Sequence, residues 1–412
     1  MANNKDFFKQ KRQWSLVKDE LLRCYLSPYL NKIIMTRKPT LYVDCFAGQG
    51  KFDDGQDGSP LTALKCVRDS IEKYSHAHPG AVVPEIYLRF IELHYADALN
   101  GNIPDEHKSR CKVISGRYEE QIVPLLNKAI ASFKGQLNVF LYVDPYGIKA
   151  LNANLFCQLP KVFNSAELLI NLNSVGFIRE ALRVRKIALK ENEAELLADL
   201  EEFDTTGINS IQELNEVAGG DYWQDIVDDY KSGIIDFYEA EKRFSAAYKR
   251  MLRKAYRYVL DMPIRIKAGN NPKYRMVHAT NHPQGCLLMA DNVFKRTEYL
   301  VVDIQRNGQI SLFEQSPDNE YVDMDMLERK MLALLDLSKG SWMRLKCVQA
   351  VFFDEYGVIC ATKHLSTMAD SVLKRLESKD QIEVKRTDSR GKLKQSRAWT
   401  EGKDLIIEIR RK

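Results

Sequence analysis

The chain has 412 residues and a formal net charge of +5, a length that exceeds what one compact core usually serves, so we expect two or more domains. A hydrophobic content of 45% and a charged content of 28% are those of an ordinary globular protein. No apolar run reaches membrane-spanning length, and the polar N-terminus lacks the apolar core of a signal peptide. These features exclude a membrane-spanning or secreted chain, so we expect a cytoplasmic protein without membrane association.

The residues that could hold a metal are sparse. Eight cysteines are scattered along the chain with no C-x-x-C spacing, and we interpret them as reduced, mostly buried thiols. His278 and His282 lie in "VHATNHP" with no third ligand in view. A histidine in a strand is more often a hydrogen-bonded core residue than a ligand, so we predict no metal site.

The first half of the chain alternates strand and helix patterns. Residues 14–34 predict an amphipathic helix inside a lead-in of residues 1–35. The predicted strands are 40–46, 85–92, 111–115, 138–144 and 167–172, and the helices between them are 60–74, 117–133 and 152–163. This alternation predicts a Rossmann-like α/β domain over 36–176, with a parallel sheet covered on both faces.

After residue 176 the alternation stops. Residues 177–263 are charged and helix-patterned, and we interpret them as a helical insertion whose aromatic residues form its own core. Strand character returns at 274–282, so we expect residues 264–300 to rejoin the sheet domain, with 264–282 as the edge of the sheet. Residues 301–324 are predicted to be a linker.

The last segment, residues 325–412, contains 19 Lys and Arg against 13 Asp and Glu, so the positive excess of the chain lies here. Helical patterns at 325–337, 343–354 and 363–378 precede two strand-like arms around "DSRG", which predicts a basic winged-helix-like domain. A solvated hairpin or a protein-docking module is the alternative to nucleic-acid binding. The residues predicted to contact nucleic acid are Lys363, Arg386, Arg390, Lys392, Lys394 and Arg397.

A cofactor site is predicted where the first strand ends on Asp44 and runs into a glycine-rich loop, because glycines let backbone amides approach a ligand closely. Neither the G-x-G-x-x-G nor the P-loop spacing is present, which disfavours phosphate cradling. S-adenosylmethionine remains the candidate, with Asp44 binding its ammonium and Glu92 its ribose. A tight connection without a ligand is the alternative. The predicted cofactor residues are Asp44, Phe46, Ala47, Gly48, Gly50 and Glu92.

A catalytic position is predicted at the end of the fourth strand, "FLYVDPYG". Pro145 restricts Asp144 to extended backbone, which holds its carboxylate beyond the sheet. A carboxylate or neighbouring carbonyl could accept a hydrogen from the exocyclic amine of a base, while Tyr146 stacks on that base. We therefore predict catalytic roles for Asp144, Pro145 and Tyr146; a plain turn with a core tyrosine is the alternative.

These motifs together resemble a known family. "DCFAGQGKFDDGQDGSPLTAL" resembles the DxFAGxG…GSPLxAL signature of the three-Cys-motif partner (TcmP) proteins. "LYVDPYG", "VHATNHPQGCLLMADNVF" and "VKDELLRCYLSPYL" resemble that family's DPxG strand, its FATNHPxGxxxM segment and its leading K-x-x-L-L-x-x-Y-L helix, so the resemblance covers about 14–300. It implies a class I methyltransferase-like fold and association with a three-cysteine-motif protein similar to radical S-adenosylmethionine proteins.

The resemblance also assigns residues. Asp44, Phe46, Gly48 and Gly50 match the cofactor loop, and Asp144, Pro145 and Gly147 match the strand at the catalytic position. The DPxG form also resembles tRNA guanine-N2 methyltransferases, but a single proline departs from the (D/N)PP(Y/F) form of adenine methyltransferases.

The sequence leaves two main hypotheses for the function of the chain. The chain is either a methyltransferase acting on nucleic acid, with a base nitrogen favoured, or an inactive methyltransferase-fold scaffold whose winged helix binds DNA or docks a partner. A modification other than methyl transfer is a third possibility.

Overall fold

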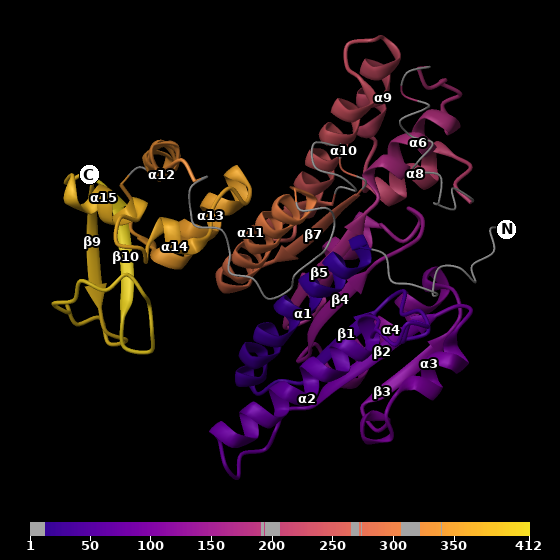
Figure 1. Cartoon of the computed structure of the whole chain (residues 1–412), viewed down its shortest axis with the longest axis horizontal. Helices are drawn as coiled ribbons and strands as arrows, with labels where there is room; N and C mark the ends of the chain where they lie inside the picture. The colour runs from indigo at the N-terminus through magenta and orange to yellow at the C-terminus, as the bar shows by residue number, and fades with distance from the viewer. Residues whose placement is uncertain are drawn as a thin grey trace. The chain divides into compact units, whose positions relative to one another are not determined.

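The structure, a computed structural model, describes residues 13–190, 193, 207–264, 272, 274–305, 322–338 and 340–412. It divides into two compact units, Met1–Asn281 and His282–Lys412, which are described separately (Figure 1). None of the helices in these ranges combines the length and the apolar character that crossing a membrane requires.

The first unit contains a mixed seven-stranded sheet in the order β3-β2-β1-β4-β5-β7-β6. Its strands are β1 Thr40–Asp44, β2 Ile86–Glu92, β3 Cys111–Ser115, β4 Asn138–Val143, β5 Ser165–Leu172, β6 Tyr258–Ile264 and β7 Tyr274–Thr280. Strands β1 to β5 are parallel, and β7 runs antiparallel to both β5 and β6. The predicted α/β, Rossmann-like methyltransferase-type sheet is confirmed.

Helices cover both faces of this sheet. They are α1 Gln13–Ile33, η2 Ile34–Thr36, α2 Ser59–Ala77, α3 Ala96–Asn102, η3 Asp105–His107, α4 Tyr118–Phe133, α5 Ala153–Val162, α6 Ser174–Val184, α8 Ile211–Ala218, α9 Trp223–Lys231 and α10 Phe237–Leu252. Helices α1 and α2 lie together on one face (Figure 1). Side chains alternate along β1, so Leu41 and Val43 join a core with α4 and α5, while Tyr42 packs in the cluster beneath α1.

The helices between β5 and β6 extend the core on the α4 and α5 side. The ring of Phe177 stacks on that of Phe244 at 3.9 Å, and Trp223 and Tyr248 are fully buried. These residues belong to the same apolar cluster as the strands. The interpretation of the aromatic residues of 177–263 as core is therefore confirmed, although the core is shared with the sheet.

Helix α1 is fixed to the sheet by a buried polar cluster. The Tyr25 hydroxyl donates a hydrogen bond to Glu167 of β5, and the Thr280 hydroxyl donates to the same carboxylate at 3.0 Å. His278, 1% exposed, lies with its Nε2 3.4 Å from Glu167, as a core histidine would. Lys18 precedes Tyr25 by two turns of α1 and so projects from the same face of the helix.

The edge of the sheet differs from the prediction. We expected 264–282 to form it, but β7 lies between β5 and β6, and β6 is the edge strand. Strand β6 pairs with one neighbour and contains Pro263, whose missing N–H is tolerated at an edge. Most of β6 therefore falls inside the segment that we predicted to be helical.

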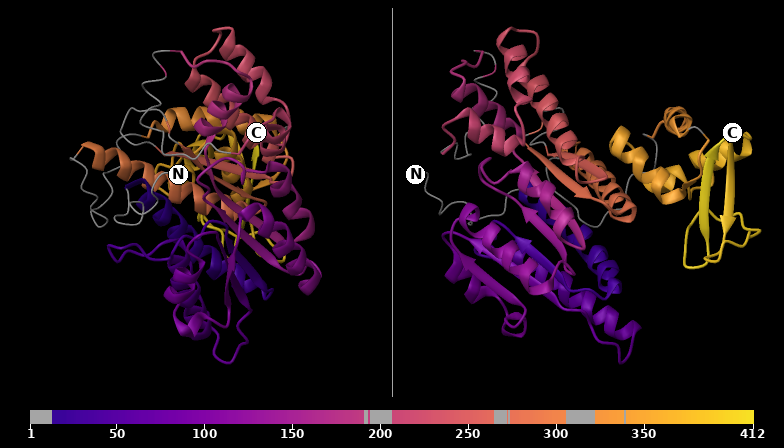
Figure 2. Two further views of the ribbon diagram at one scale, coloured as in Figure 1. Left: turned by 90° about the vertical axis from the view of Figure 1, so that its right-hand side faces the viewer. Right: turned by 180° about the vertical axis from the view of Figure 1, so that it is seen from behind.

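The second unit consists of helices and a small antiparallel sheet in the order β8-β10-β9. Its elements are α11 Pro283–Gln305, α12 Met324–Leu337, β8 Met343–Arg344, α13 Leu345–Tyr356, α14 Thr362–Leu365, α15 Val372–Ser378, β9 Ile382–Thr387 and β10 Ile406–Arg411. Strands β9 and β10 lie side by side (Figure 2).

Helix α11 belongs to this unit, since Asp291 accepts hydrogen bonds of 2.7 Å from the N–H and the hydroxyl of Thr362. Residues 264–300 were predicted to belong to the sheet domain, whereas the second unit begins at His282. Residues 306–321, most of the predicted linker, lie outside the described residues.

Two details of the basic segment differ from the prediction. The helix expected over 363–378 is interrupted, because the chain turns between α14 and α15, where the Ser371 hydroxyl donates to the Ser366 carbonyl at 2.8 Å. The arm expected after "DSRG" is mostly irregular and meets β9 at the Thr387–Leu393 bridge, whereas the main partner of β9 is β10. The winged-helix assignment stays a prediction.

Candidate functional site

Three predicted acids lie at one edge of the sheet. Asp44, the last residue of β1, pairs in register with Phe90 of β2 and with Tyr142 of β4. Glu92 and Asp144 each follow two residues after those partners. Because these strands are parallel, the three carboxylates share the carboxyl edge, where open α/β sheets bind their ligands.

Asp44 is completely buried. One carboxylate oxygen, Oδ1, accepts a hydrogen bond of 3.3 Å from the Phe46 N–H, while Oδ2 accepts none from the residues that the structure describes. Burial raises the pKa of Asp44 from 3.8 to about 7, although the nearby Ser59 hydroxyl and the Phe46 N–H both act to lower it. A buried oxygen without a donor is costly, by about 1–3 kcal/mol, so this arrangement favours a donor that comes from a ligand or water.

The glycine loop after β1 is held by Glu92. Gly48 and Gly50 have φ values of 63° and 82°, in the region that favours glycine. The Gly48 N–H donates to Oε2 of Glu92 at 2.7 Å, and the N–H groups of His94 and Tyr95 donate to Oε1 at 2.9 and 3.2 Å. Glu92 therefore orders this loop, and a carboxylate with about four acceptor positions retains one on Oε2.

The other two predicted loop residues pack behind the glycines. The Ala47 N–H donates to the carbonyl of Ile91 at 3.1 Å, which joins the loop to β2. The Phe46 ring lies 5.2 Å from that of Tyr118, which is 4% exposed. Phe46 and Ala47 thus support the loop.

Asp144 is contacted by three residues that were not among the predicted site residues. The Lys18 ammonium lies 2.8 and 2.6 Å from its two oxygens, and the Asn171 amide donates to Oδ1 at 2.7 Å. The Tyr142 hydroxyl reaches Oδ2 at 3.4 Å. Two of these residues could have been noticed in the sequence, because Lys18 is the lysine of the K-x-x-L-L-x-x-Y-L motif and Asn171 interrupts an apolar strand. Among the described residues, these partners come from α1, β4 and β5, outside the helices between β5 and β6.

The other predicted catalytic residues follow Asp144 directly. Pro145 is buried, whereas 45% of the Tyr146 side chain is exposed. The pKa of the Tyr146 hydroxyl is raised, first by its partial burial and then by the nearby charges of Asp144 and Glu92. Tyr146 is therefore partly exposed and lies near enough to both carboxylates for their charges to act on its hydroxyl.

Of the predicted nucleic-acid residues, Arg386 is buried and the other five are exposed. Arg386 is 8% exposed, pairs with Glu377 at 2.9 Å and lies 5.0 Å over the ring of Trp399, so it is a structural residue of its own unit. Lys363 is exposed on α14. The remaining four, which we call the basic loop, are exposed between β9 and β10: Arg390, Lys392, Lys394 and Arg397.

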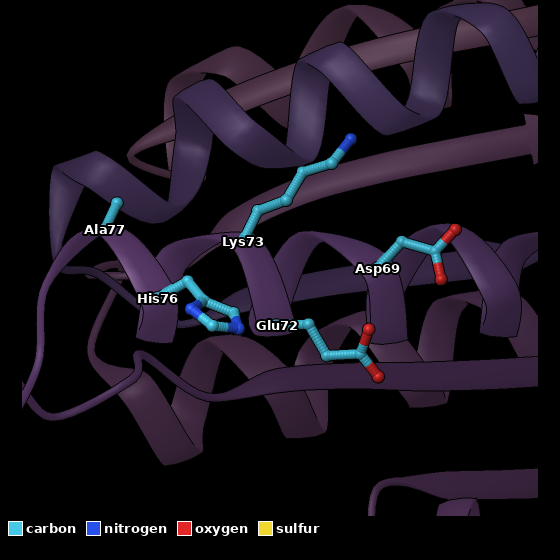
Figure 3. Close-up of a pocket in the computed structure, with 5 residues that line it drawn as sticks. All are labelled: Asp69, Glu72, Lys73, His76 and Ala77. Carbon is cyan, nitrogen blue, oxygen red and sulfur yellow. The ribbon is translucent and has the colours of Figure 1, made fainter.

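A depression of about 570 Å³ lies elsewhere, on α2 (Figure 3). It is lined by Asp69, Glu72, Lys73, His76 and Ala77. All five are exposed residues of one helix. By the rise of an α-helix, Lys73 lies roughly 21 Å from Ser59, where α2 leaves the glycine loop. This depression is separate from the three acids.

Comparison with known proteins gives distant similarities. No protein-family model matches the chain, and no curated protein does. Among solved structures, protein LPL1258 from Legionella pneumophila is similar with a TM-score of 0.37 and 11% identity, over 70% of this chain and 94% of that one. A loganic acid methyltransferase with SAH gives 0.31 and 11%, over 75% and 87%. The plantazolicin methyltransferase BamL, also with SAH, gives 0.28 and 12%, over 67% and 90%. Scores this low do not assign a function to the site.

Proposed function

We propose that this chain is an S-adenosylmethionine-dependent methyltransferase acting on nucleic acid, with a base nitrogen as the favoured acceptor. The observation that carries the proposal is the gathering of Asp44, Glu92 and Asp144 at the carboxyl ends of the parallel strands β1, β2 and β4, beside a glycine loop. A small ligand with one cation and a ribose suits such an edge.

The residues fit this cofactor. Oδ2 of Asp44 is a buried acceptor without a donor among the described residues, which suits the cofactor ammonium. Glu92 retains one acceptor position for a ribose hydroxyl, and the positive φ values of Gly48 and Gly50 keep a Cβ out of the loop. When bound, the cofactor would supply an electrophilic methyl group, with the electrons of the broken C–S bond remaining on sulfur.

The acceptor side of the site would bind a base. Tyr146 offers an exposed ring, and stacking on such a ring contributes about 1–3 kcal/mol per base. Extruding a paired base costs a few kcal/mol, so the ring offsets much of this cost without giving tight binding alone. The Asp144 cluster beside the ring would orient the reacting group by hydrogen bonding.

Nucleic acid is favoured by the exposed cations of the basic loop, since each phosphate contact adds salt-dependent affinity. In this proposal the winged-helix-like unit delivers the nucleic acid to the sheet unit. Association with a three-cysteine-motif protein rests on the resemblance of the sequence motifs to the three-Cys-motif partner family.

The test is methyl labelling of DNA and RNA, with the nucleosides analysed by mass after digestion. Wild type is expected to add one methyl group, and Asp144→Ala to label at least about 100-fold more slowly. Asp69→Ala, an exposed acid on α2, is the matched control and should label like wild type. Equal labelling by wild type and Asp144→Ala would remove Asp144 from the site.

An inactive scaffold is the second candidate, and it is favoured by the Lys18 ion pair that covers Asp144. In that case the basic loop would be the functional part of the protein, and it would bind DNA or dock the three-cysteine-motif protein. Folded protein that binds nucleic acid but neither S-adenosylmethionine nor S-adenosylhomocysteine would establish this alternative.

A further inference from the structure

The hydrogen-bonding capacity of Asp144 is already used. A carboxylate has about four acceptor positions. Lys18 occupies one on each oxygen, Asn171 a second on Oδ1, and the Tyr142 hydroxyl a second on Oδ2 at 3.4 Å. The ammonium of Lys18 also balances the charge of the carboxylate. The side chain of Lys18 is 11% exposed and that of Asp144 is 22% exposed. Asp144 therefore has no free position for a hydrogen of the substrate.

Asn171 has the acceptor that Asp144 lacks. Because Val143 pairs with Ile170, the next residue, Asn171, lies beside Asp144. The Asn171 NH₂ group donates to a carboxylate that can only accept, so the orientation of the amide is fixed. Its carbonyl oxygen is buried, 2% of the residue being exposed, and has no hydrogen-bond partner among the described residues.

The position of Asn171 is rigid. Strand β5 is paired on one side with β4 and on the other with β7, where Asn171 is opposite Met276. A side chain on a central strand whose amide is held by an ion pair is well suited to orient a reacting group. An unpartnered buried carbonyl is costly to keep, which favours a donor other than the residues that the structure describes.

We propose that the Asn171 carbonyl, and not Asp144, accepts the hydrogen bond from the methyl-acceptor group, and that Lys18 and Asp144 act as positioning residues for Asn171. This proposal rests on the proposed function. A neutral carbonyl accepts from N–H or O–H, so the atom that is methylated carries a hydrogen. Exocyclic amines of bases meet this condition, and ring nitrogens without a hydrogen do not.

The first test is Asn171→Leu, measured by methyl labelling of total RNA and genomic DNA, by titration with S-adenosylhomocysteine and by thermal unfolding. Labelling should fall about 10- to 100-fold, while the Kd for S-adenosylhomocysteine changes less than about twofold. The Tm should change little, because the substitution removes both an unpartnered buried carbonyl and a hydrogen bond to Asp144. Labelling within about threefold of wild type, or loss of S-adenosylhomocysteine binding together with a lower Tm, would overturn the role of Asn171.

The second test compares Lys18→Met with Lys18→Arg. The methionine should lower labelling about tenfold, and the arginine should retain most of it, because a guanidinium keeps the bidentate contact with Asp144. Arg23→Met is the matched control, an exposed cation on the same helix that pairs with Glu20. Equal labelling by the two Lys18 variants would overturn its role.

The product gives an independent readout. The methyl group should be found on an exocyclic nitrogen or a hydroxyl oxygen, and a methyl group on a ring nitrogen that carries no hydrogen would overturn the inference. The proposed function fails separately, and this inference with it, if wild type does not bind S-adenosylhomocysteine. Wild type that methylates alongside a fully active Asn171→Leu contradicts this inference alone.

Discussion

Asp44 is a fully buried acid whose pKa is raised from 3.8 to about 7 by burial. Between these two values the folded state holds a proton that the unfolded chain has released. The free energy of unfolding therefore falls as the pH rises from about 4 to 7, and this loss persists above pH 7.

Asp44→Asn should remove this dependence. The variant is expected to gain up to about 4 kcal/mol over wild type at pH 8 and little at pH 4, because a neutral amide replaces a buried charge. Urea unfolding at both pH values measures the difference. Asp69→Asn, at an exposed site, should leave the pH profile unchanged. If Asp44→Asn kept the wild-type pH profile, Asp44 would not be the group responsible.

The predicted acids could be found from the sequence because each follows a short apolar run, and the ends of parallel strands meet at one edge. Lys18 lies in a recognisable motif, but its pairing with Asp144 could not be predicted, since the two residues are 126 positions apart in sequence. Arg386 was predicted to contact nucleic acid because it lies in a basic run. Only the fold reveals that its side chain is buried between Glu377 and Trp399.

The two glycines Gly50 and Gly55 of the loop after β1 should differ in how well they tolerate a side chain. An added Cβ at Gly50, with φ +82°, would lie 2.7 Å from Cδ1 of Leu99, whereas at Gly55, with φ +84°, it would meet nothing within 4 Å. Gly50→Ala should therefore cost about 1–2 kcal/mol more than Gly55→Ala, and should weaken S-adenosylhomocysteine binding. Thermal unfolding and titration of the two variants measure this. Equal effects would show that Leu99 gives way and that the contact is unimportant.

Helix α1 offers a matched pair of tyrosines. Tyr25→Phe removes a donor to the buried Glu167 carboxylate and should lower the free energy of unfolding by about 1–3 kcal/mol. Tyr29→Phe should be neutral or stabilising, because the buried Tyr29 hydroxyl has no hydrogen-bond partner among the described residues. Denaturant unfolding of both variants checks this. Equal losses would mean that Tyr25 does not anchor α1 through Glu167.

Strands β1 to β5 were predicted to within about two residues because their apolar runs are bounded by turn residues. Strand β6 was missed, since it contains Pro263 and follows a long helix-patterned segment. The split between α14 and α15 was missed because the apolar spacing of 363–378 continues through the turn. In β6 the pairing with β7 overrides the helical pattern, and between α14 and α15 the hydrogen bond from Ser371 to Ser366 accompanies the turn.

At the scale of the molecule, the positive charge is concentrated in residues 325–412. Lys392→Glu with Lys394→Glu should weaken binding to duplex DNA and lower the slope of log affinity against log salt by about 2. Lys73→Glu with Lys112→Glu, exposed lysines of the sheet unit, changes the net charge equally and is the control. The same salt dependence in both double variants would contradict a specific role for the basic loop and favour a protein partner.

The boundary between the units could not be derived from composition. Helix α11 begins at the proline of "VHATNHP", yet its contacts with Thr362 and His364 place it in the second unit. A boundary of this kind depends on which surface buries the helix, and the sequence pattern predicts only that one face is apolar.

The proposed function is tested most directly by calorimetric titration of the intact chain with S-adenosylhomocysteine at pH 6 and pH 8. We expect one site per chain and an affinity about tenfold weaker at pH 6, because Asp44 must be ionised to pair with the ligand ammonium. Absence of binding at millimolar ligand by correctly folded protein, at either pH, would contradict the proposed function.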